Sequence, residues 1–251
     1  MNPVVLIFFA THREMKSILQ ECLFRNYYGK FIYQCEFNNF HIHAVITGIG
    51  PKNIPKRIKK YRELFSYLPV SVLILGLSGG LDDKLKTGDV VNVCKSLSVY
   101  EPDQIYAINK KSIFSCAIDE LIQKGTIING SCLSSDKVLE TSGKKEESYK
   151  KYKCSIVDME TAFILKEIGD IETPVTVLRV VSDTARDTLP ETAVIWGHGN
   201  LFKIFTTLIK ELMNLKRCIA LIELNRKVKK SFKSLRRVMG CCLNSNVVIV
   251  I

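Results

Sequence analysis

Carboxylate side chains follow two short apolar stretches of the sequence, at positions where a strand would end. Asp158 and Glu160 lie at the end of the stretch Ser155–Met159, and Asp183 closely follows Val175–Val181. An ionised group that is removed from water needs a partner or a chemical task. Two interpretations stay open: an ion-pair cluster that joins two buried strands, or a polar pocket at the strand ends that binds hydroxyl groups and supplies an acid.

One basic and one further acidic residue are candidates for the same site. Arg179 lies four residues before Asp183, so the period-two alternation of a strand puts both on one face if the strand continues that far. Glu14 follows the first apolar stretch at the start of an expected helix. A carboxylate at that position either compensates the helix dipole or enters catalysis, and both interpretations stay open.

Glycines lie where three of the expected strands end. They are Gly48 and Gly50, the segment Gly76–Gly80, and Gly88. Glycine lets a backbone approach a ligand closely, and the amides at a helix N-terminus favour an anion. The same glycines are also typical of plain tight turns. We expect the segment Gly76–Gly80 to be a loop that follows a strand.

The histidines and cysteines do not indicate a metal site. His41 and His43 share one face of an expected strand, but no third ligand of matching spacing is evident. The nine cysteines are scattered without a CxxC pair, which favours reduced thiols over a disulfide framework. We therefore expect neither a metal ion nor a cofactor.

Short apolar runs that alternate with helical patterns must position these side chains. The alternation predicts an α/β fold, a single domain with a mixed central β-sheet flanked by helices. The expected strands are 3–10, 31–37, 40–47, 70–75, 89–94, 126–132, 155–159 and 175–181. The expected helices are 12–25, 51–68, 112–124, 159–168 and 201–215, and the charged stretch 144–153 is expected to be a solvated helix or loop.

Size, composition and charge set the outer limits. The 251 residues are 47% hydrophobic and 24% charged, the ordinary balance of a globular protein with a sizeable core. The run Val4–Ala10 is too short for a membrane span or a secretory leader, so we expect a cytoplasmic protein. The net charge is +11, and residues 214–240 hold nine basic residues and one acidic residue, hence 9 − 1 = +8. We expect a nearly neutral domain at 1–213 and a basic helical C-terminal extension at 214–251.

The basic extension carries an amphipathic pattern. Its apolar helical stripe consists of Leu212, Leu215, Ile219 and Ile222, continued by Phe232 and Leu235. A basic amphipathic helix is typical of binding to a membrane surface, and the alternative is packing on the same domain or on another subunit. Binding to nucleic acid is not expected, because aromatic residues are sparse in this segment.

Taken in chain order, five motifs resemble the nucleoside phosphorylase family. They are Gly48-Ile49-Gly50, Gly76-Leu77-Ser78-Gly79-Gly80-Leu81, Thr87-Gly88-Asp89-Val90-Val91, Val157-Asp158-Met159-Glu160 and Arg179-Val180-Val181-Ser182-Asp183. The most similar branch comprises the methylthioadenosine/S-adenosylhomocysteine nucleosidases and the related hopanoid-associated phosphorylases. The resemblance covers roughly residues 3 to 190 and implies an enzyme that cleaves the N-glycosidic bond of a purine nucleoside.

The resemblance implies roles for the matching positions. Met159 and Glu160 match the pair that binds ribose, and Asp183 beside Ser182 matches the acid that protonates N7 of the departing purine. Glu14 matches the glutamate that activates water in the nucleosidases. These residue types suit the chemistry, because cleavage builds positive charge on the sugar and negative charge on the base.

Other positions depart from the family's pattern. The glycine segment matches the lining of the ribose and nucleophile sites, but Leu77 stands where a serine is common, followed by Ser78 and Gly79. Val138 and Leu139 stand where many nucleosidases place an aromatic residue that stacks on adenine. The identity of the base is therefore open.

The nucleophile also stays open. Phosphorylases of the family commonly carry an arginine on the strand before the glycine segment, but residues 72–75 are all apolar. Arg13 and Arg179 are the remaining candidates to bind phosphate or to orient the nucleophile. We expect release of the base from a small-molecule purine nucleoside, in particular a 5′-substituted adenosine, by attack of water or phosphate.

Two further expectations follow from the resemblance and from the basic helix. Family membership implies a homo-oligomer. The alternative to an enzyme is a catalytically silent nucleoside-binding or membrane-associated protein of the same fold.

Overall fold

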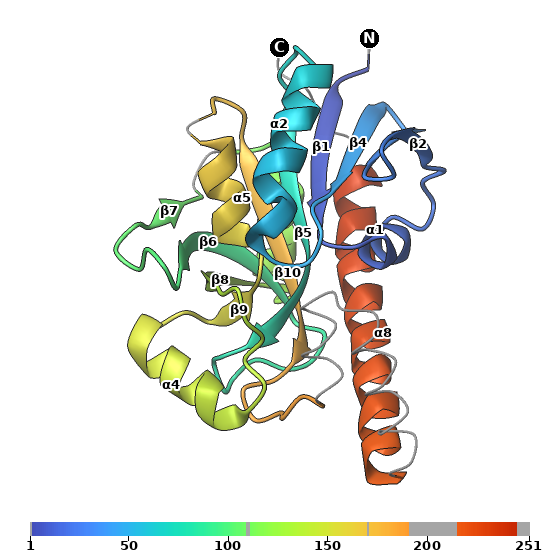
Figure 1. The fold of residues 1–251 in the computed structure, drawn as a ribbon. Coiled ribbons are helices and arrows are strands. Elements are labelled where there is room, and N and C mark those ends of the chain that lie inside the picture. Colours follow the sequence, from blue (N-terminus) through green and yellow to red (C-terminus); the bar gives the residue numbers. More distant parts are fainter. Residues whose placement is uncertain (1, 109–110, 170, 191–214, 245–251) are drawn as a thin grey trace.

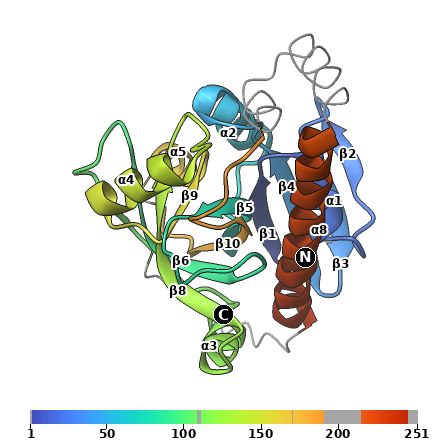
Figure 2. The same cartoon turned by 90° about the horizontal axis from the view of Figure 1, so that it is seen from below.

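The computed structural model describes residues 2–108, 111–169, 171–190 and 215–244. They form an α/β body in which helices cover both faces of a mixed sheet (Figures 1 and 2), as the sequence predicts. The strands are β1 (Val4–Phe9), β2 (Arg25–Tyr28), β3 (Ile32–Phe37), β4 (Phe40–Ile46), β5 (Ser71–Gly80), β6 (Val90–Ser98), β7 (Tyr106–Ala107), β8 (Ile127–Ser134), β9 (Ile156–Asp158) and β10 (Val175–Asp183). The helices are α1 (His12–Ile18), the 3₁₀ helix η1 (Pro51–Asn53), α2 (Ile54–Leu64), α3 (Ser115–Gln123), α4 (Ser142–Tyr152), α5 (Thr161–Ile168) and α8 (Leu215–Asn244).

Part of the sheet closes into a ring. β10 pairs in parallel with β5 and antiparallel with β6. β8 lies parallel to both β6 and β9, and β9 returns antiparallel to β5. The strands β5, β10, β6, β8 and β9 therefore close on themselves, while β1, β4, β3 and β2 extend the sheet from β5. This closure brings the ends of β5, β9 and β10 together.

Each face of the sheet packs on its own helices. Leu73 and Leu75 of β5 point into a core that they share with α1, α3 and α8. The alternate residues Val72 and Ile74 point into a second core with α2 and α5. Figure 2 shows α2 and α5 on one side of the strands and α1 and α8 on the other. Because both faces are covered here, β1 and residues 72–75 of β5 consist entirely of apolar residues.

The C-terminal helix contributes to the first of these cores. Phe232, Leu235 and Met239 are buried in it. The Ser231 hydroxyl donates to the Val181 carbonyl on β10 at 2.7 Å. The second half of α8 is thus packed on the body, whereas its first turns extend beyond the other described elements in Figure 1. The division of the chain at residues 213 and 214 stays a prediction.

The expected helix 12–25 is wrong in its second half. α1 ends at Ile18, and Arg25–Tyr28 forms β2, which pairs antiparallel with β3. Gly29 and Lys30 both have a positive φ, as a tight hairpin turn requires. Residues 19–24 form the connection between α1 and this strand rather than a continuation of the helix.

The expected loop at Gly76–Gly80 is also wrong. β5 continues through all five residues, because β10 pairs with it as far as Gly79 and β9 pairs with Gly79 and Gly80. The short strand β7 was not predicted, and the other strands agree with the prediction to within a few residues. Most of the expected helix 201–215 lies outside the described residues.

Candidate active site

Glu14 lies in the first turn of α1 and is buried. The Thr11 hydroxyl accepts from the Glu14 amide, and Glu14 Oε2 accepts in return from the Thr11 amide at 2.8 Å, which makes a capping box. The other oxygen, Oε1, accepts from the amide of Leu77 on β5 at 3.1 Å. Burial raises the pKa of Glu14, although Arg179 and these hydrogen bonds oppose the increase.

Arg179 on β10 forms the centre of a group of carboxylates. Its Nη2 lies 2.6 Å from Asp158 Oδ2 and 3.8 Å from Glu160 Oε2. The side chain is only 1% exposed, and desolvation opposes its charge. Asp158 and Glu160 nevertheless keep the pKa of Arg179 above its usual value. The guanidinium is thus a permanent cation inside the protein.

Asp158 supports this group rather than facing outward. Ser134 Oγ donates to its Oδ1 at 2.6 Å, and the Thr161 amide donates to its Oδ2 at 3.1 Å. Ser134 Oγ also accepts from the amide of Ala162 at 2.8 Å. These bonds tie β8 and β9 to the first turn of α5. Asp158 therefore holds Arg179 in a fixed place relative to three elements.

Glu160 is the carboxyl group of the cluster with the fewest donors. Its Oε1 accepts from the amide of Gly50 at 2.9 Å, and Arg179 is its cationic neighbour. Burial, together with the carboxylates of Asp158 and Glu14, raises the pKa of Glu160 to about 8, although Arg179 lowers it. A carboxyl group in this state can accept and donate hydrogen bonds near neutral pH, which suits vicinal hydroxyl groups.

Two glycines of β5 make room for the charged side chains. A Cβ atom at Gly76 would lie 2.5 Å from Arg179 Nη1 and 2.8 Å from Glu14 Oε1. A Cβ atom at Gly79 would lie 3.0 Å from Asp183 Oδ2. The glycine segment therefore acts as a strand whose missing side chains admit an arginine and two carboxylates.

Three buried polar atoms on or beside this strand lack a hydrogen-bond partner among the described residues. Arg179 Nη1 and Ser78 Oγ belong to predicted site residues, and the third is Ser71 Oγ at the start of the strand. An unpaired buried donor is costly, so atoms of this kind are expected to face water or a ligand. Arg179 Nη1 and Glu14 Oε1 flank the same point beside Gly76. The unpaired nitrogen of Arg179 and the carboxylate of Glu14 are therefore close neighbours beside this glycine.

Asp183 ends β10 and accepts two hydrogen bonds. Ser182 Oγ donates to its Oδ1 at 2.7 Å, and Lys145 Nζ donates to its Oδ2 at 2.6 Å. The strand register places Asp183 beside Gly79, and Gly79 beside Val157 of β9. The closed ring thus brings Asp183 to the same end of the sheet as the residues that follow β9, which include Glu160.

Lys145 is the site residue that the sequence does not reveal. The charged stretch 144–153 is predicted to be solvated, and this is wrong at Lys145, which is 0% exposed. The reason is its ion pair with Asp183, a residue 38 positions further along the chain. A lysine in a polar helix is typical of a surface, so one sequence carries no signal for this contact.

Three further predicted residues lie close to the cluster or beside α4. Met159 Cε is 3.7 Å from the point that a Cβ atom of Gly50 would occupy. Val138 and Leu139 are half-buried in the segment between β8 and α4, and Leu139 packs against an apolar cluster that includes Leu133. Contact of these residues with a base or sugar stays a prediction.

Arg13 has its neighbours on the C-terminal helix. The side chain is exposed, its Nη2 donates to Asn225 Oδ1 at 2.8 Å, and its guanidinium lies over the ring of Phe232 at 5.9 Å. Both partners belong to α8. A role of Arg13 in binding phosphate stays a prediction.

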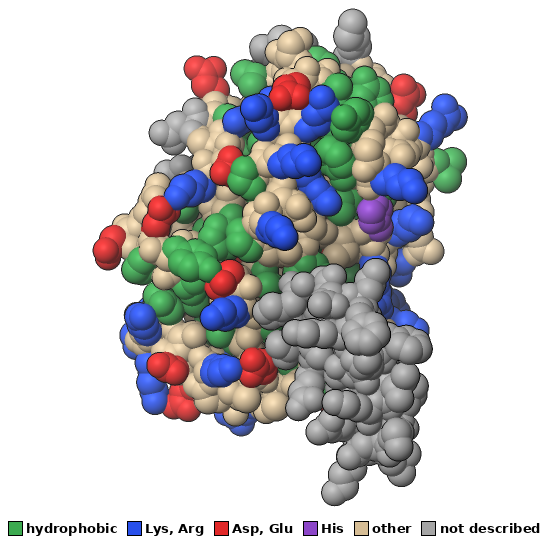
Figure 3. Space-filling model, in the orientation of Figure 1, with side chains coloured by type: hydrophobic (Ala, Val, Ile, Leu, Met, Phe, Trp, Pro, Cys, Tyr) green, Lys and Arg blue, Asp and Glu red, His purple; other side chains and the backbone are tan. Residues whose placement is uncertain are grey.

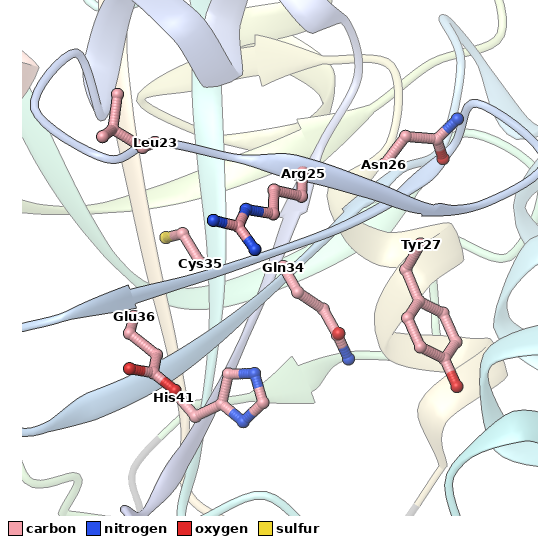
Figure 4. A pocket seen from close by; sticks show the side chains of 8 residues that line it. All are labelled: Leu23, Arg25, Asn26, Tyr27, Gln34, Cys35, Glu36 and His41. Carbon is pink, nitrogen blue, oxygen red and sulfur yellow. The ribbon is translucent and has the colours of Figure 1, made fainter.

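A surface hollow of about 530 Å³ lies away from these residues. Figure 4 shows its lining, which comes from β2, β3, the start of β4 and the segment before β2. The lining consists of Leu23, Arg25, Asn26, Tyr27, Gln34, Cys35, Glu36 and His41, and contains no predicted site residue. In the described part of the chain, no group of three or more His, Cys, Asp or Glu residues is arranged to hold a metal ion.

Comparisons with known proteins identify relatives of this architecture. The family model described as "Phosphorylase superfamily" matches residues 5–220. A futalosine hydrolase of Helicobacter pylori strain 26695 is similar with a TM-score of 0.68 at 17% identity, over 96% of this chain and 97% of that chain. A 5′-methylthioadenosine/S-adenosylhomocysteine nucleosidase from Neisseria meningitidis, in complex with methylthio-immucillin-A, gives 0.69 at 19% identity, over 98% and 100% of the two chains. The search of curated proteins gave no significant match.

Proposed function

Because the chain belongs to the phosphorylase superfamily, whose members are nucleosidases and phosphorylases, we propose that it hydrolyses the N-glycosidic bond of a purine nucleoside. The observation that carries the proposal is the arrangement around Gly76, where Glu14 and an unpaired nitrogen of Arg179 flank one point. A base and a hydrogen-bond donor so placed can orient an attacking molecule.

Water is the nucleophile that this arrangement suits. Burial raises the pKa of Glu14 and so makes its carboxylate a stronger base toward a water molecule, while Arg179 Nη1 donates to the water oxygen. Before it takes up a proton from this water, the negatively charged carboxylate stabilises the positive charge that develops on the sugar. The capping box and the Leu77 amide hold the carboxylate in this orientation.

Phosphate suits the same place less well. Three carboxyl groups, those of Glu14, Asp158 and Glu160, surround the single guanidinium of Arg179. A phosphate dianion would meet more negative than positive charge in a buried environment, where such repulsion is strong. We therefore favour hydrolysis over phosphorolysis.

The sugar and the base are assigned to the two ends of the cluster. Glu160 is proposed to bind the 2′ and 3′ hydroxyl groups, with Met159 beside the ring. Asp183, oriented by Ser182, is proposed to serve the leaving purine at N7. The names of the solved relatives, which include methylthioadenosine and futalosine, favour a nucleoside with a 5′ substituent, so we propose a 5′-substituted adenosine.

Membrane contact and self-association stay separate expectations. Within the described residues, no helix has the length and apolar character needed to cross a bilayer. Ile219 and Ile222 of α8 are more than half exposed among basic residues, so a surface contact of this helix with anionic lipid or with a second copy stays a prediction.

The test is release of the base from methylthioadenosine, adenosylhomocysteine and adenosine, with and without phosphate, measured by chromatography. We expect free adenine from at least one of them in phosphate-free buffer. The Glu14→Gln variant should lower the rate about 100-fold or more, because it cannot take a proton from water. The matched control is Glu36→Gln, an exposed glutamate on β3, which should leave the rate unchanged.

Each other outcome has a clear meaning. Release that depends on phosphate, with a ribose 1-phosphate product, would replace hydrolysis by phosphorolysis. No release from any nucleoside would favour the catalytically silent alternative.

A further inference from the structure

Lys145 is a fully buried cation with three partners. Its ammonium group donates to Asp183 Oδ2 at 2.6 Å, to the Thr184 carbonyl at 2.7 Å and to the Asp187 carbonyl at 3.1 Å. An ammonium group has three protons, so all of its hydrogen-bonding capacity is used. The geometry is that of a charged lysine.

The placement of Lys145 is unusual for its helix. α4 is otherwise exposed or half-buried, and Lys145 is its single buried residue. Removing an ammonium group from water costs roughly several kcal/mol. A buried lysine at this position is therefore stable only if its partners compensate that cost. Tyr149 and Tyr152 of α4 also pack against the apolar cluster that includes Leu133, but the fully buried position of the helix holds an ion pair with a proposed catalytic residue.

The ion pair with Lys145 affects whether Asp183 can donate a proton. Both carboxylate oxygens accept hydrogen bonds, one from Ser182 and one from Lys145. In this arrangement both oxygens act as acceptors, whereas a leaving purine needs a proton donor. The proton nearest to Asp183 on an acidic group is that of the Lys145 ammonium.

We propose that Lys145 supplies, through Asp183, the proton that the leaving purine takes up; the inference rests on the nucleosidase function proposed above. When the C1′–N9 bond breaks, its electron pair stays on the base and makes N7 basic. Lys145 Nζ gives one proton to Asp183, and the carboxyl group of Asp183 gives one proton to N7. Lys145 ends as a neutral amine, Asp183 ends as a carboxylate, and the base leaves neutral.

The rest of the reaction balances this transfer. Water forms the new C1′–O bond and loses one proton to Glu14, which becomes neutral. The proton on Glu14 returns to Lys145 through solvent after the products leave. Lys145 acts through Asp183 and does not itself reach the base, so it is a positioning and proton-supplying residue.

The loop after β10 is held by the same lysine and by one from the opposite side. Lys145 binds the carbonyls of Thr184 and Asp187, and Lys227 of α8 lies 2.9 Å from Asp187 Oδ1. A purely structural role of Lys145 would consist of holding this loop. The experiment must therefore separate proton supply from loop position.

Comparing two substrates with different leaving groups separates the proton-supplying role of Lys145 from its role in holding the loop. Purine nucleosides need protonation of the base, whereas 4-nitrophenyl β-D-ribofuranoside releases nitrophenolate, which leaves without a proton. Lys145→Met should lower kcat for the purine nucleoside about 100-fold or more, the usual contribution of an acid, and leave nitrophenyl riboside cleavage within about threefold of wild type. Asp183→Asn should show the same split.

Two further variants complete the design. Lys145→Gln keeps a hydrogen-bond donor toward Asp183 but has no acidic proton, so it should behave like Lys145→Met. Lys144→Met, on the adjacent exposed residue that pairs with Glu140, is the matched control and should cleave both substrates at the wild-type rate. Thermal unfolding of each variant is measured in parallel.

The outcomes distinguish this inference from the proposed function. Equal losses on both substrates in Lys145→Met and Lys145→Gln would assign Lys145 a structural role and overturn the inference while leaving the nucleosidase intact. Full purine activity in Lys145→Gln would also overturn it. A wild-type protein that cleaves neither substrate would overturn the proposed function, and the inference with it.

Discussion

Single side chains in this protein serve two purposes at once. Glu14 completes the capping box of α1 with one oxygen and binds the Leu77 amide with the other. The sequence leaves open whether a glutamate at a helix start stabilises the helix or enters catalysis. The structure makes the two compatible, because the bonds that cap the helix also orient the carboxylate toward Arg179.

At the residue scale, the raised pKa of Glu160 predicts how stability depends on pH. Between the usual pKa of a glutamate and about 8, the unfolded chain has lost the proton that folded Glu160 retains. Folding then takes up a proton, so the free energy of unfolding of the wild type falls as pH rises through this interval. Glu160→Gln removes this dependence. Between pH 5 and pH 8, its free energy of unfolding should increase relative to that of wild type by on the order of 1 kcal/mol or more.

Urea unfolding at the two pH values measures this effect. Glu36→Gln on the exposed side of β3 serves as the control, and its stability relative to wild type should be the same at both pH values. A stability difference between Glu160→Gln and wild type that is the same at pH 5 and at pH 8 would contradict the proposed burial of a proton-holding carboxyl group.

The site residues differ in how far the sequence could predict them. Asp158, Glu160 and Asp183 stand out because carboxylates seldom follow apolar strands without a purpose. The sequence does not show which of these carboxylates has which role. That depends on the ion pair of Arg179 with Asp158 at 2.6 Å, which only the structure reveals. Lys145 could not be found at all, because only the tertiary structure shows that its helix lies against Asp183.

At the scale of elements, β5 shows what the glycine segment does. Its backbone pairs with β10 on one side and β9 on the other, and the absence of a Cβ atom at Gly76 leaves space for Arg179 and Glu14. Glycine suggested a loop because it is rare inside strands. The correct interpretation of such a glycine is the close approach of charged side chains to a strand.

Gly76→Ala tests this interpretation. The added methyl group would lie 2.5 Å from Arg179 Nη1 and must displace it or Glu14. Since displacing a catalytic group by about 1 Å can lower a rate about 100-fold, we expect a loss of that order in kcat. Gly80→Ala on the same strand meets only ordinary contacts, the nearest at 3.4 Å, and is the control.

Other elements were predictable to different degrees. The strands of the ring follow from their apolar runs, and α5 and α2 follow from their helical spacing. β2 was not predictable, because its pairing depends on a turn at Gly29 and Lys30 rather than on its own residues.

Activity of Gly76→Ala equal to that of Gly80→Ala would show that the position of Arg179 is not critical.

At the scale of the whole molecule, the closed ring of strands explains why the site is at one end of the sheet. It brings residues from β5, β9 and β10 together although they are far apart in the sequence. No single-sequence pattern predicts such a closure, because the antiparallel contacts of β9 with β5 and of β10 with β6 involve only a few residue pairs.

The excess positive charge is also distributed at this scale. Lys and Arg side chains occur over the visible face in Figure 3 with Asp and Glu among them. The basic excess of α8 is accompanied by an apolar face that packs on the body, since Leu235 and Val238 are buried there. The amphipathic pattern of this helix thus predicts a packed helix at its C-terminal half.

Leu235→Ala tests whether α8 is required for the fold. The side chain is fully buried in the core that α8 shares with α1 and β10, so its truncation should lower the free energy of unfolding by about 2 to 5 kcal/mol. Lys233→Ala, on the exposed side of the same helix, should have an effect below about 0.5 kcal/mol. Equal stabilities in urea unfolding would mean that α8 is dispensable.

The most direct test of the account as a whole is a crystal structure with a bound nucleoside analogue, for which methylthio-immucillin-A is suitable. We expect the sugar hydroxyl groups within hydrogen-bond distance of Glu160, the base beside Asp183, and the sugar's reactive side toward Glu14. An analogue bound in the hollow of Figure 4, or bound with Glu160 and Asp183 out of its reach, would contradict the central claim that these carboxylates surround one nucleoside.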